Sequence, residues 1–128
     1  PKDAVGRYRV IQWLMWQMGG LGPMFGQVGF FHKFAGKDYE DKRPLQRYVD
    51  ESHRLLAVLD KQLEGQDWVA GEYSIADMAI GPWLGSFLTF YEAGDLVGID
   101  EFANVTAYFD RFSARPAAQK AKNIPPRG

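Results

Sequence analysis

Residue types that commonly catalyse reactions or bind metals are few and scattered in this sequence. The two histidines, His32 and His53, lack the spacing of a paired metal site on a helix, and we interpret both as solvated or helix-capping residues. The acidic residues Asp38, Glu40 and Asp41 alternate with aromatic and basic residues, which is typical of a solvated helix start. Because the chain has no cysteine, it offers no thiolate nucleophile and no thiolate metal ligand.

The glycine-rich run at residues 20–26 (GLGPMFG) superficially resembles a phosphate-binding loop. Its third glycine comes one position late for a dinucleotide fingerprint, no strand pattern precedes it, and no Gly-Lys-Ser/Thr follows. We therefore expect it to allow close helix packing. No serine lies in a nucleophile elbow, and Ser52 falls in an apolar stripe. The residues alone thus predict no catalytic group and no metal site.

Composition predicts one folded domain over residues 1–128. Apolar residues make up 46% of the chain and aromatic residues 15%, which excludes a disordered polymer. The net charge of −1 argues against binding to nucleic acid or to an anionic membrane. The uncharged run 10–31 contains three glutamines, five glycines and a proline, which favours a buried helix over a membrane span. The lack of cysteine suits a reducing cytoplasm, where we expect the protein.

Hydrophobic spacing predicts an all-α bundle of about five helices, with no repeat and no linker. The first helix should kink or break at Gly19–Pro23, and Pro82 should bend the third. Asp50 and Arg54 are spaced to form an ion pair across one turn of the second helix. Pro44 suits the first turn of that helix and Gly65 its end. The expected helices cover residues 4–31, 45–63, 74–92, 102–115 and 117–122.

The clearest local signal is the start of the third helix at Ser74-Ile75-Ala76-Asp77. A serine at the N-cap and a carboxylate three residues later predict a capping box, in which each side chain bonds the other's backbone amide. Tyr73 and Met78 are spaced to form a hydrophobic staple across the same turn. We expect this helix to be the central, buried one.

Three stretches together resemble the C-terminal domain of bacterial glutathione transferases, most closely the Nu class and its yeast prion-like relatives, which reduce disulfides with glutathione. Residues 13–27 (WLMWQMGGLGPMFGQ) resemble the first helix of that domain, and residues 48–63 (YVDESHRLLAVLDKQL) its second. Residues 68–79 (WVAGEYSIADMA), followed by Pro82-Trp83, are similar to the loop and capped helix found across the superfamily. A fourth, shorter stretch, residues 113–117 (SARPA), resembles the last-helix signature.

The resemblance implies a bundle with the fold of that domain, from a longer two-domain protein. Members begin with a thioredoxin-like domain that binds glutathione as substrate, and nothing before Pro1 corresponds to it. The helical domain then forms the wall of the acceptor-substrate site and much of a homodimer contact. Arg54 matches an arginine that reaches a glutathione carboxylate, and no metal is implied. The wall residues carried over are Trp13, Gln17, Met24, Phe25 and Gln27.

Alternatives remain open for these assignments. Arg54 could be an exposed partner of Asp50, and the aromatic residues of the first helix could be ordinary core. The chain could also be a non-catalytic interaction module with the same fold. The glycine-rich segment favours the enzyme, because a docking module has no need to keep the wall of a cleft. Since the residues that activate glutathione lie in the other domain, we expect the isolated chain to be inactive.

Overall fold

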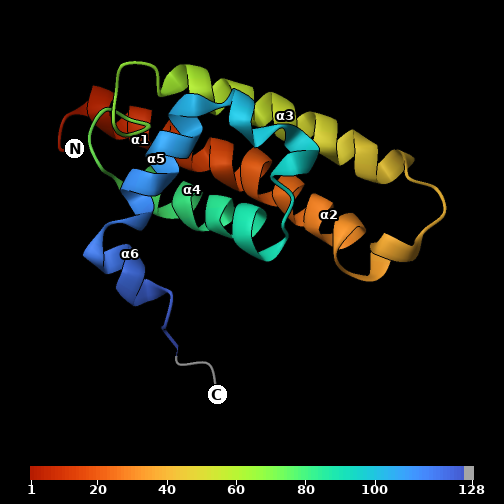
Figure 1. Cartoon of the computed structure of the whole chain (residues 1–128). Coiled ribbons are helices and arrows are strands. Elements are labelled where there is room, and N and C mark those ends of the chain that lie inside the picture. The colour runs from red at the N-terminus through yellow and green to blue at the C-terminus, as the bar shows by residue number, and fades with distance from the viewer. Residues whose placement is uncertain (126–128) are drawn as a thin grey trace.

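The computed structural model describes residues 1–125 and shows a bundle of α-helices (Figure 1). The described residues contain no β-strand, which confirms the all-α prediction. Residues 126–128, the end of the predicted domain, lie outside the described part. The α-helices are α1 (Ala4–Trp16), α2 (Gly22–His32), α3 (Arg43–Gln62), α4 (Ile75–Gly85), α5 (Ala103–Ser113) and α6 (Pro116–Ala121).

The predicted interruption of the first helix is a single π-helical turn, Gln17–Leu21, between α1 and α2. The Gly22 amide bonds the carbonyl of Gln17, five residues earlier, instead of the usual four. Pro23 has no amide hydrogen, and in an α-helix its ring would collide with the carbonyl of Gly19. Widening the turn avoids that collision, so the two helices remain continuous (Figure 1).

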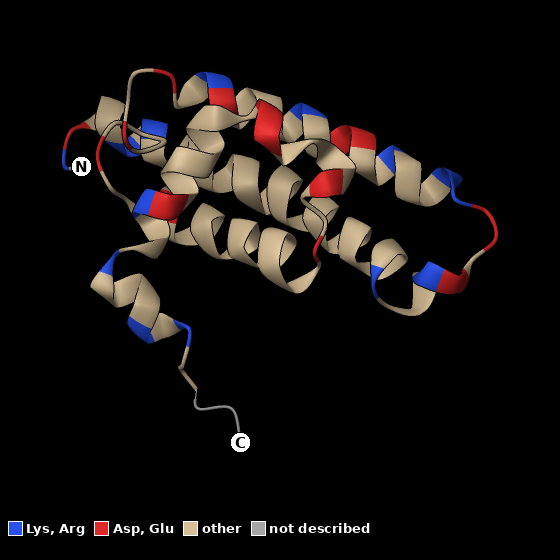
Figure 2. Ribbon diagram, viewed as in Figure 1, with Lys and Arg blue, Asp and Glu red and all other residues tan. Residues whose placement is uncertain are grey.

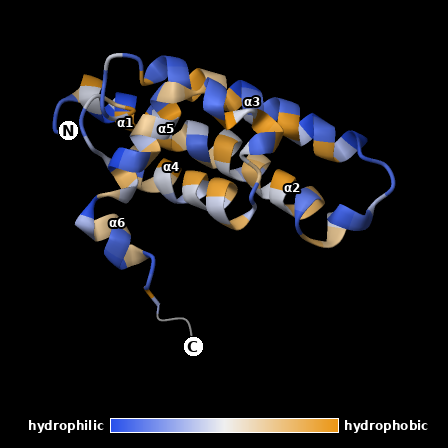
Figure 3. Cartoon of the chain, viewed as in Figure 1, coloured by the Kyte–Doolittle hydropathy of each residue, from blue (hydrophilic) through white to orange (hydrophobic). Residues whose placement is uncertain are grey.

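Helix α3 is the long amphipathic helix that the sequence predicts. Its buried face contains Leu55, Leu56 and Leu59, and its charged residues lie on the outer side (Figures 2 and 3). Pro44 is in the first turn, and Gly65 follows the helix with a φ of 72°, a conformation that favours glycine.

Helix α4 has no Lys or Arg, as its uniformly tan ribbon beyond the first turn shows (Figure 2), but it is buried on one side only, because Ile75 and Met78 are 54% and 52% exposed. The prediction of a central, buried helix therefore holds for one face of α4. Pro82 lies within it, and a second π-helical turn, Ser86–Phe90, follows. Its buried residues Ile80 and Leu84 pack into a core shared with α2, α3 and α5.

Helix α5 is capped by a residue from another helix. Phe102, at its N-cap position, makes no side-chain cap, and the Asp60 carboxylate of α3 accepts hydrogen bonds from the amides of Asn104 (2.8 Å) and Val105 (3.1 Å). These two hydrogen bonds hold the start of α5 against α3.

The acidic segment before α3 differs in part from the prediction of a helix start. Ala35–Asp38 forms a short 3₁₀ turn, and Glu40 lies in the exposed loop after it. Asp41 accepts a hydrogen bond from the Arg43 amide at 3.0 Å and also binds the Arg43 side chain. Asp41, one residue before the N-cap position Lys42, therefore bonds the first amide of α3, and Lys42 itself makes no side-chain cap.

Candidate functional site

The residues predicted from the first helix are not all on one surface. Trp13 is 7% exposed and packs edge-on against Trp16, with ring centroids 5.1 Å apart. Phe25 is completely buried and stacks on Phe87 of the second π turn at 4.0 Å. Because neither ring has appreciable free surface, the structure favours the core alternative for both residues. Met24 is partly buried against the core, and Gln27 is exposed.

Gln17 opens the π turn and is only 2% exposed. Its carboxamide lies beside Gly22 and the indole of Trp83 from α4. A methyl group built on Gly22 would lie 2.5 Å from Gln17 Nε2 and 2.8 Å from Trp83 Nε1. A side chain at position 22 would collide with both groups unless they shift, so this close approach favours glycine. The glycine-rich run thus permits close packing between the π turn and α4, as the sequence predicts.

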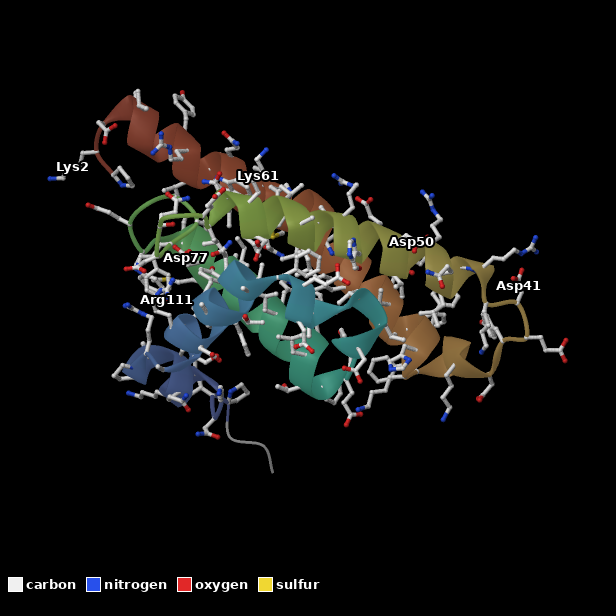
Figure 4. The ribbon with its side chains drawn as sticks, turned by 45° about the horizontal axis from the view of Figure 1, so that its top comes forward. Lys2, Asp41, Asp50, Lys61, Asp77 and Arg111 are labelled. Carbon is white, nitrogen blue, oxygen red and sulfur yellow. The ribbon has the colours of Figure 1, made fainter. Side chains whose placement is uncertain are left out.

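Arg54 lies on the solvent side of α3 and its side chain is 61% exposed. The prediction that it pairs with Asp50 is wrong. Its guanidinium donates two hydrogen bonds to Glu51, from Nε at 2.8 Å and from Nη2 at 2.7 Å. Positions three and four residues apart are both neighbours on a helix, and the longer Glu51 side chain reaches both donors. Asp50 instead accepts a hydrogen bond from Gln46 at 2.7 Å, and it lies on the outer side of α3 (Figure 4).

This ion pair changes the electrostatics of both partners. The hydrogen bonds from Arg54 lower the pKa of Glu51 below its ordinary value, and Glu51 raises the pKa of Arg54. Arg54 therefore presents a guanidinium already oriented by one carboxylate, with most of its surface open to solvent. A planar guanidinium binds carboxylates through two parallel hydrogen bonds, and the pair with Glu51 has this form.

The capping box at α4 forms, and it belongs to a larger buried network around Asp77, which is labelled in Figure 4. The Ser74 hydroxyl accepts a hydrogen bond from the Ala76 amide at 3.2 Å, and Asp77 accepts one from the Ser74 amide at 2.8 Å. Asp77 also accepts hydrogen bonds from the Val69 amide and the Tyr108 hydroxyl. Burial and the neighbouring Asp77 charge raise the pKa of Tyr108, which keeps its hydroxyl protonated as a donor.

The staple between Tyr73 and Met78 remains a prediction. Met78 is 52% exposed. The Tyr73 ring lies edge-on against Trp68, with centroids 4.8 Å apart, and under the Arg115 guanidinium, at 3.5 Å from its centre. Tyr73 therefore joins the loop before α4 to the start of α6.

No group of three or more metal-ligating side chains occurs among residues 1–125. His53 lies 3.6 Å from Glu101 and edge-on to Phe102. A cavity of about 410 Å³ lies between α5 and the segment from the second π turn to Ile99, and its wall contains none of the predicted site residues. Nor is any helix within the described part long and apolar enough to cross a membrane.

Sequence reasoning missed Trp83 as a partner of the predicted site. Trp83 belongs to the motif that resembles the capped helix, but its approach to Gly22 of the π turn joins two segments far apart in the chain. The usable signal is Gly22, since a glycine inside an apolar helix often marks a close approach by another element.

Comparison with known proteins links these features to one family. Residues 21–116 match the family described as "Glutathione S-transferase, C-terminal domain". The disulfide-bond oxidoreductases YfcG and YghU of Escherichia coli are 37% and 34% identical over 90% and 97% of this chain. The matches cover 51% and 43% of those two proteins, so the chain spans about half the length of the curated relatives it matches.

Solved structures agree over the whole chain. A glutathione transferase from Burkholderia graminis, described with two glutathione molecules bound per subunit, is 60% identical with a TM-score of 0.97. The match covers 100% of this chain and 54% of that one. A glutathione transferase from Pseudomonas putida, described with one glutathione disulfide per subunit, is 58% identical with a TM-score of 0.96, over 98% of this chain and 54% of that one.

Proposed function

Because the chain belongs to the glutathione S-transferase C-terminal domain family, we propose that it is the helical half of a cytoplasmic glutathione-dependent transferase or disulfide-bond reductase. One observation carries this proposal: the chain matches, over its full length and at 60% identity, half of a structure described with two bound glutathione molecules per subunit. Glutathione is then a substrate of the whole protein, and a domain beyond this chain activates its sulfur.

Arg54 is the residue we assign to glutathione binding. Its guanidinium is exposed, oriented and already engaged with a carboxylate, so a glutathione carboxylate can replace or join Glu51 without reorganising α3. The exposed ion pair contributes little to the stability of the fold, which leaves Arg54 available for a ligand.

The wall of the acceptor-substrate site is assigned to the surface of the first helix around the π turn. Met24 and Gln27 contribute flexible and polar groups at that surface, while Gln17, which is only 2% exposed, lies beneath it in the π turn. Trp13 and Phe25, which have almost no free surface, hold the helix in place from behind. Glycines in the turn leave its backbone accessible to a ligand.

Apolar surface on α1 supports contacts beyond this chain. Val5, Tyr8 and Met15 are 74%, 70% and 54% exposed, and their spacing places them on one face. A row of this kind marks an interaction surface more often than a free one. We assign it to the homodimer, which size-exclusion chromatography with light scattering of the full-length protein would test.

Calorimetric titration of glutathione into the full-length protein tests the assignment of Arg54. Arg54→Ala should weaken binding by roughly tenfold to a hundredfold, the range for hydrogen bonds to a charged group. Arg54→Lys should restore only part of the affinity, because an ammonium keeps the charge and loses the paired donors. Arg47→Ala, an exposed arginine of the same helix, is the matched control and should leave binding unchanged.

Two results would contradict the proposal at different levels. Equal affinities for the parent and Arg54→Ala would return Arg54 to the role of a surface partner of Glu51. A full-length protein that neither binds glutathione nor exchanges it with a disulfide would favour the interaction module with this fold.

A further inference from the structure

The cavity beside α5 contains none of the residues assigned to glutathione, and much of its wall is apolar. It measures about 410 Å³, the size of pockets that bind small organic molecules. Leu88 of the second π turn, Ile99, and Phe109 of α5 line it, and each of these side chains also packs against the core. A ligand with an apolar body would therefore contact a surface that the core already holds in place.

The loop that forms one side of the cavity is held by short contacts. The amides of Val97 and Ile99 both donate hydrogen bonds to the Gly94 carbonyl, at 3.2 and 3.1 Å. A methyl group built on Gly94 would lie 3.3 Å from both Leu88 and Ile99, so this backbone lies directly against the apolar wall. The hollow is thus bounded by packed chain on the loop side as well as on the α5 side.

The charged residues of the wall all have one sign. Glu92, Asp95 and Asp110 lie in it, and no Lys, Arg or His of the described chain does. The whole stretch 92–110 contains five acidic residues and no Lys, Arg or His, although the net charge of the chain is only −1. A cleft that combines apolar walls with charges of one sign focuses the electric field and raises the local concentration of ions of opposite charge. The cavity therefore favours a cation.

Two of the three carboxylates have no internal cation beside them. Lys33, which lies outside the wall, binds Glu92 at 2.7 Å and balances its charge. Asp95 and Asp110 take part in none of the ion pairs among residues 1–125. A cationic group in the cavity would therefore meet two carboxylates that the described chain does not pair.

The arrangement favours an organic cation over a metal ion. No three metal-ligating side chains of the described chain lie close enough together to hold one ion. A metal ion would also leave the apolar wall exposed to water, whereas an ammonium group attached to an apolar body would bury that wall and neutralise the carboxylates.

We propose that this cavity binds an organic cation with an apolar body, such as a primary amine on an aromatic or alkyl group. The apolar body lies against Leu88, Ile99 and Phe109, and the ammonium group lies toward Asp95 and Asp110. The site goes beyond the proposed function and does not depend on it, because none of its residues is assigned to glutathione.

The test is a titration of the full-length protein, followed by ligand-observed NMR, with three probes of similar shape and different charge. Phenethylammonium should bind with a Kd of about 1–10 mM, the affinity expected for so small a ligand. Phenethyl alcohol keeps the ring and loses the charge, so it should bind at least about fivefold more weakly. Phenylpropionate carries a negative charge and should show no saturable binding, because the carboxylates of the wall repel it.

Variants then locate the cation. Asp95→Asn and Asp110→Asn should each raise the Kd for phenethylammonium about two- to fivefold, the range for one exposed ion pair. Both side chains are exposed, so the fold should not change. Asp100→Asn is the matched control, since Asp100 is an exposed acidic residue of the same stretch outside the wall, and it should leave the Kd unchanged. A salt concentration of about 0.15 M screens effects from outside the cavity.

A further measurement in the parent does not depend on any variant. The backbone amide resonance of Gly94 should shift on saturation with phenethylammonium, while that of Gly65, beyond the end of α3, should not. Equal affinities for the ammonium and the alcohol overturn the proposal. So does an unchanged Kd when both Asp95 and Asp110 are replaced by asparagine, or a Gly94 amide that does not shift.

Discussion

Replacing Asp77 should destabilise this domain more than replacing any exposed helix cap. The carboxylate is completely buried and accepts hydrogen bonds from the Val69 amide (3.0 Å), the Ser74 amide (2.8 Å), the Ser74 hydroxyl (3.3 Å) and the Tyr108 hydroxyl (3.1 Å). Asp77→Ala leaves the Val69 and Tyr108 donors buried and unbonded, at about 1–3 kcal/mol each. Loss of the cap adds about 1 kcal/mol. We therefore expect a loss of about 4 kcal/mol.

Urea unfolding followed by far-ultraviolet circular dichroism measures this loss. With a denaturant slope of about 2 kcal/mol per molar, the midpoint should fall by about 2 M. Asp3→Ala is the control, because Asp3 caps α1 with one exposed hydrogen bond to Gly6 at 2.7 Å and should cost only about 1 kcal/mol. Tyr108→Phe should also cost about 1 kcal/mol, since it removes one donor and leaves the carboxylate with three. If Asp77→Ala lowers the free energy of unfolding no more than Asp3→Ala does, the buried hydrogen bonds to Asp77 do not stabilise the domain beyond an ordinary helix cap.

Gly22→Ala should destabilise the domain by about 1–3 kcal/mol in the same urea assay, because the added methyl group collides with Gln17 and Trp83. Gly19→Ala should be neutral or stabilising, because a methyl group added at Gly19 has no neighbouring atom within 4 Å. Asp60→Ala should cost about 1–2 kcal/mol, because it uncaps α5, and amide hydrogen exchange should rise first at Asn104 and Val105. The isolated chain should not conjugate glutathione to an electrophile, and turnover at the rate of the full-length protein would refute the assignment of sulfur activation to another domain.

Local rules were enough to predict most of the fold. The helix positions and the capping box follow from spacing and from Ser74 and Asp77. Pro23 among glycines predicted an interruption of the first helix, but a kink or break was expected and the structure has a π turn. Contacts between segments far apart in the chain could not be predicted from the sequence. Asp77 bonds Tyr108 across 31 positions and Asp60 caps α5 across 44, and no local pattern announces either contact.

The candidate site was predicted less completely, for the same reason. A resemblance can carry over Phe25 and Trp13, but only packing shows that their rings have almost no free surface. The partner of Arg54 depended on which carboxylate reaches it, since both Asp50 and Glu51 have suitable spacing. Helical periodicity alone does not distinguish a partner three residues away from one four residues away.

The π turn also determines where this bundle can change length. Buried residues 13, 17, 21 and 25 follow one another at steps of four, which in an ordinary helix would drift by about 40° per step. The π turn contains about one residue more than an α-helical turn. Deleting one of residues 18–20 should therefore leave a regular α-helix in which the buried faces of α1 and α2 still point toward the core. The same deletion within α3 would rotate everything after it by about 100° and expose its leucines. Insertions and deletions in relatives should therefore be tolerated at this turn and excluded from the middle of α3.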